Sequence, residues 1–147
     1  KEPLMQLVPY LTFNGNCREA FTFYQQLFNG KILYLGTFGE MPDAPPMPEA
    51  ARNAVMHVNL QIGAQQLMGS DAMPGAGEEC AGGYVRPQGM NMSIGVESEA
   101  EGRRIFDALA EGGTVTMPFG KTFWSPGFGM LKDRFGTPWM VNVAEPA

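Results

Sequence analysis

The chain has 147 residues, of which 44% are hydrophobic and 17% are charged, as in a folded globular protein with one domain or two half-size modules. Its formal net charge of −5, without a cluster of Lys or Arg, argues against nucleic-acid binding. No apolar run approaches the ~20 residues of a membrane-spanning helix, and the first residues lack a secretory signal pattern. Cys17 and Cys80 form no C-x-x-C pair. We therefore expect a cytoplasmic protein with no membrane partner.

The first half of the chain predicts a strand at residues 7–13 and then an amphipathic helix. Apolar residues recur at i, i+3, i+4 and i+7 from Cys17 to Phe28, as on one face of a helix. Asn16 and Glu19 have the spacing of a capping box, and Gly30 is suited to end the helix. Three strands are predicted to follow, at residues 31–38, 54–63 and 65–72.

The second half repeats this order. A strand is predicted at residues 90–96, and a helix follows in which Ser98 and Glu101 repeat the capping-box spacing. Gly112 and Gly113 would end this helix, and three more strands are expected at residues 114–124, 127–136 and 138–144. The repeated order indicates an internal duplication. We expect one domain over residues 1–147, with module one at about 5–72, a linker at about 73–89 and module two at about 90–145.

Two segments interrupt the pattern. Residues 39–53 contain four prolines and three acidic residues, and residues 72–89 are rich in glycine. Such segments are either solvated surface loops or lids that close over a cavity.

Five segments occur in order along nearly the whole chain: PYLTFNGNCREAFTFY, FGEMP, VMHVNLQIG, LMGSDAMP and TFWSPGFGMLKDRFGTPWMVN. In them the chain resembles the PhnB-like branch of the vicinal oxygen chelate superfamily, a branch also labelled 3-demethylubiquinone-9 3-methyltransferase. The resemblance implies an α+β fold in which two tandem β-α-β-β-β modules form a curved mixed sheet around a cleft, as in glyoxalase I and bleomycin-resistance proteins. It also implies a homodimer. The sequence offers no strand, glycine loop and helix of the kind that holds S-adenosylmethionine.

Metal-dependent members of this superfamily take their ligands from inward positions on the first and last strands of each module. Matching those positions by strand and turn spacing gives Pro9, Met68, Asn91 and Met140. None of them is the imidazole or carboxylate that such ions need. The chain has one histidine, which excludes a multi-histidine site. We expect no cofactor, and a divalent ion at a rebuilt site with His57 and Asp71 is the alternative.

His57 is the main candidate for proton chemistry. Strict strand alternation places it on one face with Val55, Asn59 and Gln61, so that this polar face would line the cleft. It is either a hydrogen-bonded structural or dimer-interface histidine or a catalytic acid/base, because imidazole can exchange a proton near neutral pH.

Three carboxylates also leave alternatives open. Asp71 could orient His57 or contact a ligand, or it could be a turn or cap residue. Glu40 is either an acid at the cleft rim or a solvated loop residue. Asp133, shortly before Gly136, is expected to be a structural turn residue.

Aromatic residues gather near the C-terminus and either fill the core or line a small-molecule site. The complete set of predicted ligand-binding residues is Trp124, Phe123, Phe128, Trp139, Asp71, Glu40, Asn91, Met68 and Tyr10. The first hypothesis for function is metal-independent binding of a small, partly apolar molecule in the cleft between the modules. The second is an isomerase or lyase with His57 as acid/base. A dimerisation module without a ligand is the third, and whether the protein is an enzyme stays open.

Overall fold

The computed structural model describes residues 5–72 and 84–145, and its backbone contacts divide the chain into two compact units between Val85 and Arg86. We describe each unit by itself. Most of the predicted linker lies outside the described residues, as does Cys80, and residues 84–89 form neither helix nor strand. None of the helices in the described part of the chain is long and apolar enough to cross a membrane.

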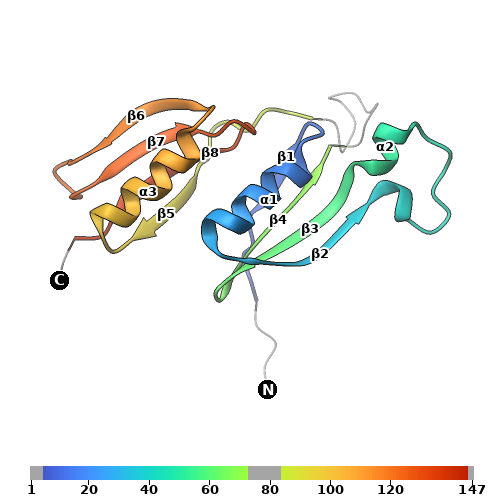
Figure 1. Cartoon of the computed structure of the whole chain (residues 1–147), viewed down its shortest axis with the longest axis horizontal. Coiled ribbons are helices and arrows are strands. Elements are labelled where there is room, and N and C mark those ends of the chain that lie inside the picture. The colour runs from blue at the N-terminus through green and yellow to red at the C-terminus, as the bar shows by residue number, and fades with distance from the viewer. Residues whose placement is uncertain (1–4, 73–83, 146–147) are drawn as a thin grey trace, which may run out of the picture. The chain divides into compact units, whose positions relative to one another are not determined.

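The first unit is a four-stranded mixed sheet with one long helix. Its elements are β1 (Tyr10–Phe13), α1 (Cys17–Phe28), β2 (Lys31–Thr37), β3 (Val55–Ile62) and β4 (Gln65–Asp71). The strand order is β1-β4-β3-β2, in which β1 and β4 are parallel and the other pairs antiparallel (Figure 1). The segment between β2 and β3, predicted as a loop, also forms a 3-10 turn η1 (Phe38–Glu40) and a short helix α2 (Glu49–Asn53).

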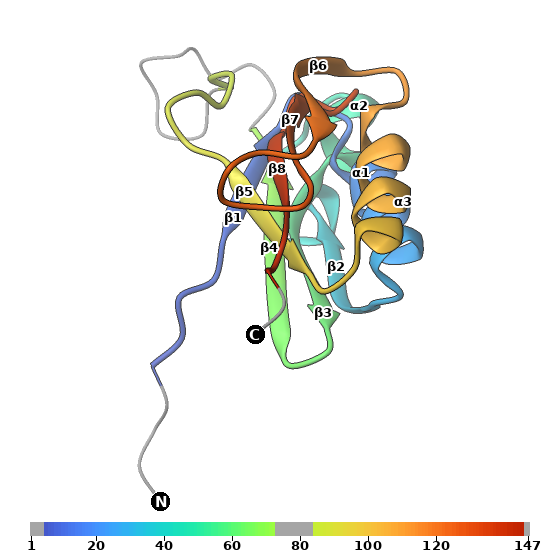
Figure 2. The same cartoon turned by 90° about the vertical axis from the view of Figure 1, so that its left-hand side faces the viewer.

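The second unit repeats this topology. It contains β5 (Met92–Val96), α3 (Glu99–Ala110), β6 (Thr114–Gly120), β7 (Phe128–Lys132) and β8 (Pro138–Val143), in the order β5-β8-β7-β6. Again the first and last strands are parallel, and Figure 2 shows α3 lying along one side of its strands. The α+β fold with two similar modules is therefore confirmed, whereas the cleft stays a prediction.

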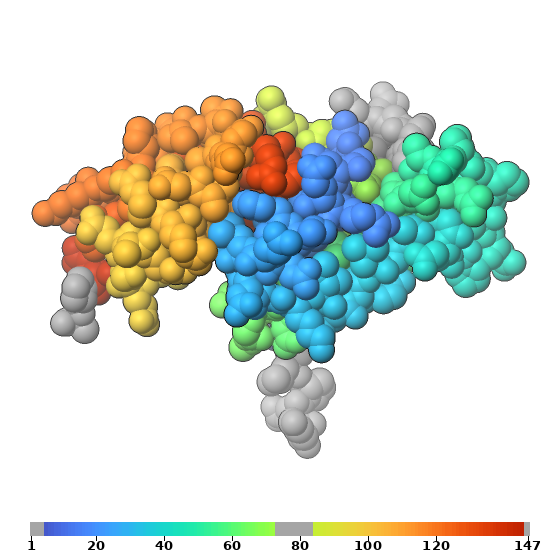
Figure 3. Space-filling model, in the orientation of Figure 1, coloured from blue at the N-terminus to red at the C-terminus, as the bar shows by residue number. Residues whose placement is uncertain are grey.

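Each helix buries one apolar stripe against one face of its own sheet. In α1 the buried residues are Cys17, Ala20, Phe21 and Tyr24, and in α3 they include Ile105, Phe106 and Leu109. Burying one such large apolar side chain contributes roughly 1.5–3 kcal/mol. A Cβ on Gly69 in β4 would lie 2.7 Å from the Phe21 ring, so this glycine lets α1 approach the sheet closely. Figure 3 shows the helix side of the first unit, with α1 in blue.

The start of α1 differs from the prediction. The prediction of a capping box formed by Asn16 and Glu19 is wrong, because the Asn16 side chain makes no capping hydrogen bond. Instead, Asp71 at the end of β4 accepts the backbone N–H of Cys17 at 3.0 Å. An acceptor from a distant strand thus replaces the local cap.

The end of α1 comes one residue earlier than predicted. Asn29 adopts the left-handed conformation at φ 53°, and the Gly30 N–H donates to the carbonyl of Gln25 at 2.9 Å. Gly30 has a different role, because a Cβ there would lie 2.7 Å from the backbone oxygen of Gln61. The glycine therefore permits the chain to pass close to β3.

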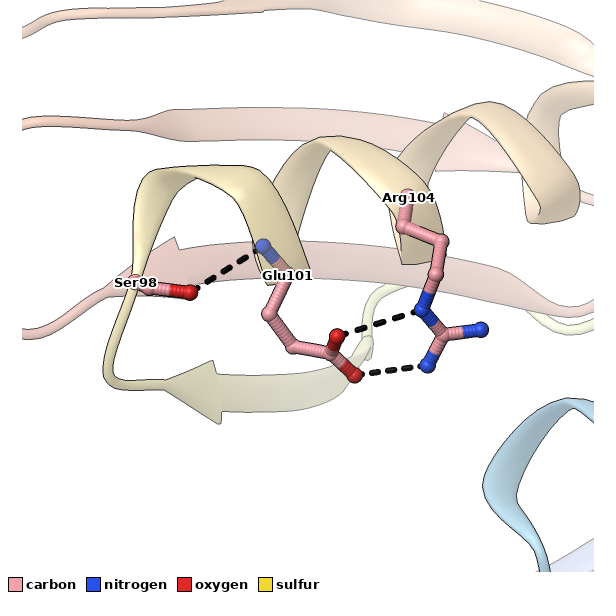
Figure 4. A network of polar contacts seen from close by, with 3 residues as sticks. All are labelled: Ser98, Glu101 and Arg104. Atoms are coloured by element: carbon pink, nitrogen blue, oxygen red, sulfur yellow. Dashed lines mark hydrogen bonds and ion pairs between the residues drawn. The ribbon is translucent and has the colours of Figure 1, made fainter.

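The start of α3 follows the prediction in part. Ser98 Oγ accepts the backbone N–H of Glu101 at 3.1 Å, as a capping residue does (Figure 4). The Glu101 carboxylate does not complete the capping box, because it pairs with Arg104 at 2.6 and 3.1 Å. This hydrogen-bonded pair lowers the pKa of Glu101 and raises that of Arg104.

Candidate functional site

The side of the first sheet that faces away from α1 carries the predicted site residues His57, Tyr10 and Met68. In β3, Val58 and Leu60 are buried toward the helix, whereas His57 and Asn59 are partly exposed on the opposite face. The predicted alternation is therefore confirmed for His57 and Asn59. It fails for Val55, which is fully buried next to a register shift between β2 and β3.

His57 lies between two tyrosines on this helix-free face. The Tyr10 hydroxyl is 3.1 Å from Nδ1 of His57, and the two rings are nearly parallel, with centroids 5.6 Å apart and an interplanar angle of 25°. The Tyr34 ring lies on the other side, at 6.1 Å and 34°. Tyr10 is 48% exposed and Tyr34 is 51% exposed. We call Tyr10, His57 and Tyr34 the Tyr–His–Tyr row.

Tyr34 was not among the predicted site residues, and Gly36 explains how it reaches its position. Gly36 pairs with His57 across β2 and β3, and a Cβ on Gly36 would lie 2.8 Å from Cζ of Tyr34. The phenol ring thus covers the backbone of Gly36 beside the imidazole. A strand bulge between Ile32 and Tyr34 sets this register, and strict alternation from the sequence does not reveal it.

Asp71 belongs to the helix side of the sheet. Its carboxylate accepts the backbone N–H groups of Gly15, Cys17 and Val55 at 2.9–3.0 Å, and the residue is 4% exposed. It neither orients His57 nor lies open to a ligand, so the structure corrects its place in the predicted site. Burial, together with the nearby Asp71 charge, raises the pKa of the Cys17 thiol well above its ordinary range. Cys17 is therefore an inert core residue.

Glu40 closes a local turn at the end of β2. Its Oε1 accepts the backbone N–H and the hydroxyl of Thr37, both at 2.9 Å. These hydrogen bonds, the one from the backbone first, lower the pKa of this exposed carboxyl. Its charge is thus held within its own turn.

In the second unit, three of the four predicted aromatic residues form a surface cluster. Trp124 meets Phe123 edge-to-face at 4.8 Å and Phe128 at 5.2 Å. Phe123 is 94% exposed. The loop that carries Phe123 and Trp124 is anchored by buried Ser125, whose hydroxyl lies 2.7 Å from the carbonyl oxygens of Gly127 and Val143.

The fourth predicted aromatic residue, Trp139, lies in the core, and its assignment to a ligand site is wrong. It is 2% exposed, and its Nε1–H donates to Oδ2 of Asp133 at 2.8 Å. The other oxygen of Asp133 accepts the backbone N–H groups of Phe135 and Thr137. The predicted structural role of Asp133 is therefore confirmed.

The predicted ligand positions of the superfamily carry weak donors for a metal ion. Pro9 comes just before β1 and has no donor side chain, Met68 lies on the helix-free face of the first sheet, and Met140 lies on that of the second, with Ser93 as its strand partner. Asn91 is exposed just before β5. These thioethers, hydroxyl and amide do not fit a hard or borderline divalent ion. Within residues 5–72 and 84–145, no three His, Cys, Asp or Glu side chains gather to hold one.

Comparison with known proteins matches residues 5–142 to the family model described as 3-demethylubiquinone-9 3-methyltransferase. Protein YjdN of Escherichia coli (strain K12) is 37% identical over 149 residues, which cover 96% of this chain and 97% of that protein. The crystal structure of protein PA1353 from Pseudomonas aeruginosa is 44% identical, with a TM-score of 0.83 over 97% of this chain and all of that one.

More distant structures show how widely the fold is shared. A PhnB protein from Bacillus cereus is 25% identical, with a TM-score of 0.76 over 95% of this chain and 100% of that one. A glyoxylase/bleomycin resistance protein/dioxygenase domain from Frankia sp. EAN1pec has a TM-score of 0.60 at 12% identity, over 99% of both chains. The last likeness concerns the fold alone.

Proposed function

The chain belongs to the family described as 3-demethylubiquinone-9 3-methyltransferase, the PhnB-like branch of the vicinal oxygen chelate superfamily, and on this basis we propose that it binds a small, partly apolar molecule without a metal ion. The observation that carries the proposal is the Tyr–His–Tyr row, in which two half-exposed phenol rings flank one imidazole. Aromatic rings with a few polar groups among them are typical of small-molecule sites.

The physical argument concerns what these side chains offer together. Tyrosine rings supply a large contact area at a low cost in conformational entropy, because they have few rotatable bonds. The imidazole of His57, held by the Tyr10 hydroxyl, supplies a hydrogen bond that orients a ligand. The proposal includes no methyl transfer, because each described sheet has a single parallel strand pair rather than the open parallel sheet that holds S-adenosylmethionine in Rossmann-type enzymes.

The test is a screen of small aromatic molecules by thermal shift and ligand-observed NMR on the full chain. A ligand that binds the folded state raises the melting temperature. Truncation of a central contact in Tyr34→Ala is expected to weaken binding about tenfold. The control is Gln26→Ala, an exposed position on α1, which should leave the affinity unchanged. A screen without any binder, or equal affinity in Tyr34→Ala, would contradict the proposal.

Binding also bears on the predicted cleft. Trp124 and Trp139 are the two tryptophans of the chain, and both lie in the second unit. If a molecule whose binding requires Tyr34 also quenches the fluorescence of the exposed Trp124, this would support a ligand that reaches both units. Unchanged Trp124 emission would confine the ligand to the first unit.

A second candidate function is catalysis with His57 as acid/base. It is favoured by the Tyr10 hydrogen bond, because a partner on Nδ1 orients the ring and leaves Nε2 for proton exchange. Loss of a general acid/base typically lowers a rate by about 10²–10⁴-fold. His57→Ala would then abolish turnover of a bound molecule while binding persists. Mass spectrometry of ligands recovered from the wild-type protein decides between the two functions, because pure binding leaves them unchanged.

We also propose a homodimer, which the family resemblance implies. Sedimentation velocity at micromolar concentration tests it, and a purely monomeric protein would contradict it.

A further inference from the structure

We propose that Tyr10 fixes the tautomer of His57 with hydrogen on Nε2, so that the site selects an uncharged aromatic ligand that carries an acceptor oxygen. Tyr10 is thus a positioning residue that acts through His57. The inference rests on the proposed binding function and specifies the ligand class of that same site.

The first step of the argument is the direction of the hydrogen bond between Tyr10 and Nδ1 of His57, 3.1 Å long. A neutral imidazole has one N–H donor and one acceptor nitrogen, and the partner of one nitrogen decides which atom carries the hydrogen. A phenol O–H is more acidic than an imidazole N–H, and the acceptor nitrogen is more basic than the phenol oxygen. The hydrogen therefore stays on Tyr10 and points to Nδ1, which places the ring hydrogen on Nε2.

The second step concerns the other nitrogen. Within the described residues, Tyr10 is the hydrogen-bond partner of His57, and Tyr34 meets the imidazole through its ring. The Nε2–H is thus offered to solvent or to a bound molecule. A molecule that excludes water from this donor must supply an acceptor, because a buried donor without a partner is costly.

The third step concerns shape and charge. The planes of the Tyr10 and Tyr34 rings are inclined to the imidazole by only 25° and 34°, and both tyrosines are half-exposed, so a planar ring can stack on either phenol. The cross-strand row next to His57 carries no charged side chain, since it consists of Tyr10, Met68, Asn59 and Tyr34. The pairs Thr12–Ser70 and Gly36–His57 carry none either. Lys31 follows in the next row, beside Gln61. A ligand charge at His57 would lack a counter-charge there, which favours an uncharged molecule.

The tautomer can be measured without a ligand. Because His57 is the one histidine of the chain, long-range ¹H–¹⁵N correlation NMR sees a single imidazole, whose cross-peak pattern identifies the nitrogen that carries the hydrogen. We expect the signature of a protonated Nε2 and an unprotonated Nδ1. Tyr10→Phe should give a mixture of tautomers. Tyr34→Phe also removes one phenol hydroxyl from this face, and it should leave the tautomer unchanged. Protonated Nδ1 in the wild type, or no change in Tyr10→Phe, would overturn the assignment.

The ligand class is tested with three probes of similar size: acetophenone, ethylbenzene and benzoate. Because Tyr10→Phe leaves His57 as a mixture of tautomers, the acetophenone-to-ethylbenzene affinity ratio should fall by the fraction of molecules with hydrogen on Nε2, about twofold for an even mixture. An unchanged ratio would overturn the inference and leave the proposed function standing. Tighter binding of benzoate than of acetophenone would overturn the uncharged class. Binding of none of the three would contradict the proposed function itself and the inference with it.

Discussion

Equivalent positions of the two sheets carry different chemistry on the side away from the helix. His57 pairs with Gly36 in the first unit, and at the matching place in the second unit Phe128 pairs with Gly120. The neighbouring cross-strand row contains phenol, thioether and amide groups in the first unit, but a hydroxyl and three thioethers in the second. These rows are Tyr10, Met68, Asn59 and Tyr34 in the first unit, and Ser93, Met140, Met130 and Met117 in the second.

The buried side of each unit shows the opposite relationship. Each has an apolar helix stripe and one buried aspartate, Asp71 or Asp133, that accepts three N–H groups. The helix stripe is thus shared by both units, whereas the two aspartates do the same work from different places, Asp71 at the end of β4 and Asp133 between β7 and β8. In the proposed function, the first sheet would supply the groups for specific recognition, while thioethers such as those of the second pack against many shapes.

The largest effects should come from the two buried aspartates. Asp71→Ala and Asp133→Ala each leave three N–H groups without their acceptor, and an unsatisfied buried group costs about 1–3 kcal/mol. We expect the free energy of unfolding to fall by about 3 kcal/mol or more for either variant, measured by urea denaturation. The control Asp107→Ala, on the exposed side of α3, should change it by less than about 0.5 kcal/mol. A loss as small as that of the control in either aspartate variant would contradict the structural role of that aspartate.

A smaller effect is expected for the tryptophans, which sharpen the contrast between core and surface. Trp139→Phe removes the donor to Asp133 and should lower the free energy of unfolding by about 1–3 kcal/mol. Trp124→Phe, the matched control at the surface, should cost less than about 1 kcal/mol. Acrylamide should quench the remaining Trp124 strongly in the first variant and the remaining Trp139 weakly in the second. Equal quenching would contradict the assignment.

The paired glycines provide a still finer test. Gly36→Ala should displace the Tyr34 ring from His57 and cost about 1 kcal/mol, because the ring can swing toward solvent. A Cβ on Gly120 would meet no atom within 4 Å, so Gly120→Ala should be neutral or stabilise the fold by about 0.4–1 kcal/mol. The measurements are thermal unfolding and the NOEs between Tyr34 and His57. Retention of those NOEs in Gly36→Ala would show that the ring is not seated on Gly36.

The smallest effect concerns pH. The folded-state pKa of Glu40 is lowered, so its hydrogen bonds with Thr37 stabilise the turn fully above the ordinary carboxyl pKa of about 4.3. This contribution is lost as the pH falls through the lower folded-state value. The Ser125 hydroxyl, which anchors the loop after β6, does not titrate in this range. An acid titration followed by NMR should therefore move the Thr37 amide and leave that of Gly127 in place. Glu40→Gln should remove the Thr37 shift.

The sequence predicted the elements well because apolar periodicity reports local burial, but it located the site only in part. The prediction of Ser98 as a helix cap is correct because the backbone N–H that it accepts is only three residues away. At the start of α1, the N–H of Cys17 is accepted by Asp71, 54 residues away, and local spacing cannot reveal such a partner. The prediction places Trp139 at the ligand site and Met140 at an inward ligand position for a metal, although neighbours on a strand face opposite sides. Applying that rule throughout would have placed Trp139 in the core.

The different caps of the two helices also bear on the order of folding. The first turn of α3 is capped by the local residue Ser98, so this cap can form while the chain is still extended elsewhere. The first turn of α1 needs Asp71, the last residue of the last strand in its unit, and this contact must close a long loop. The second unit can therefore nucleate from its helix, whereas the first completes its helix only when β4 has joined the sheet.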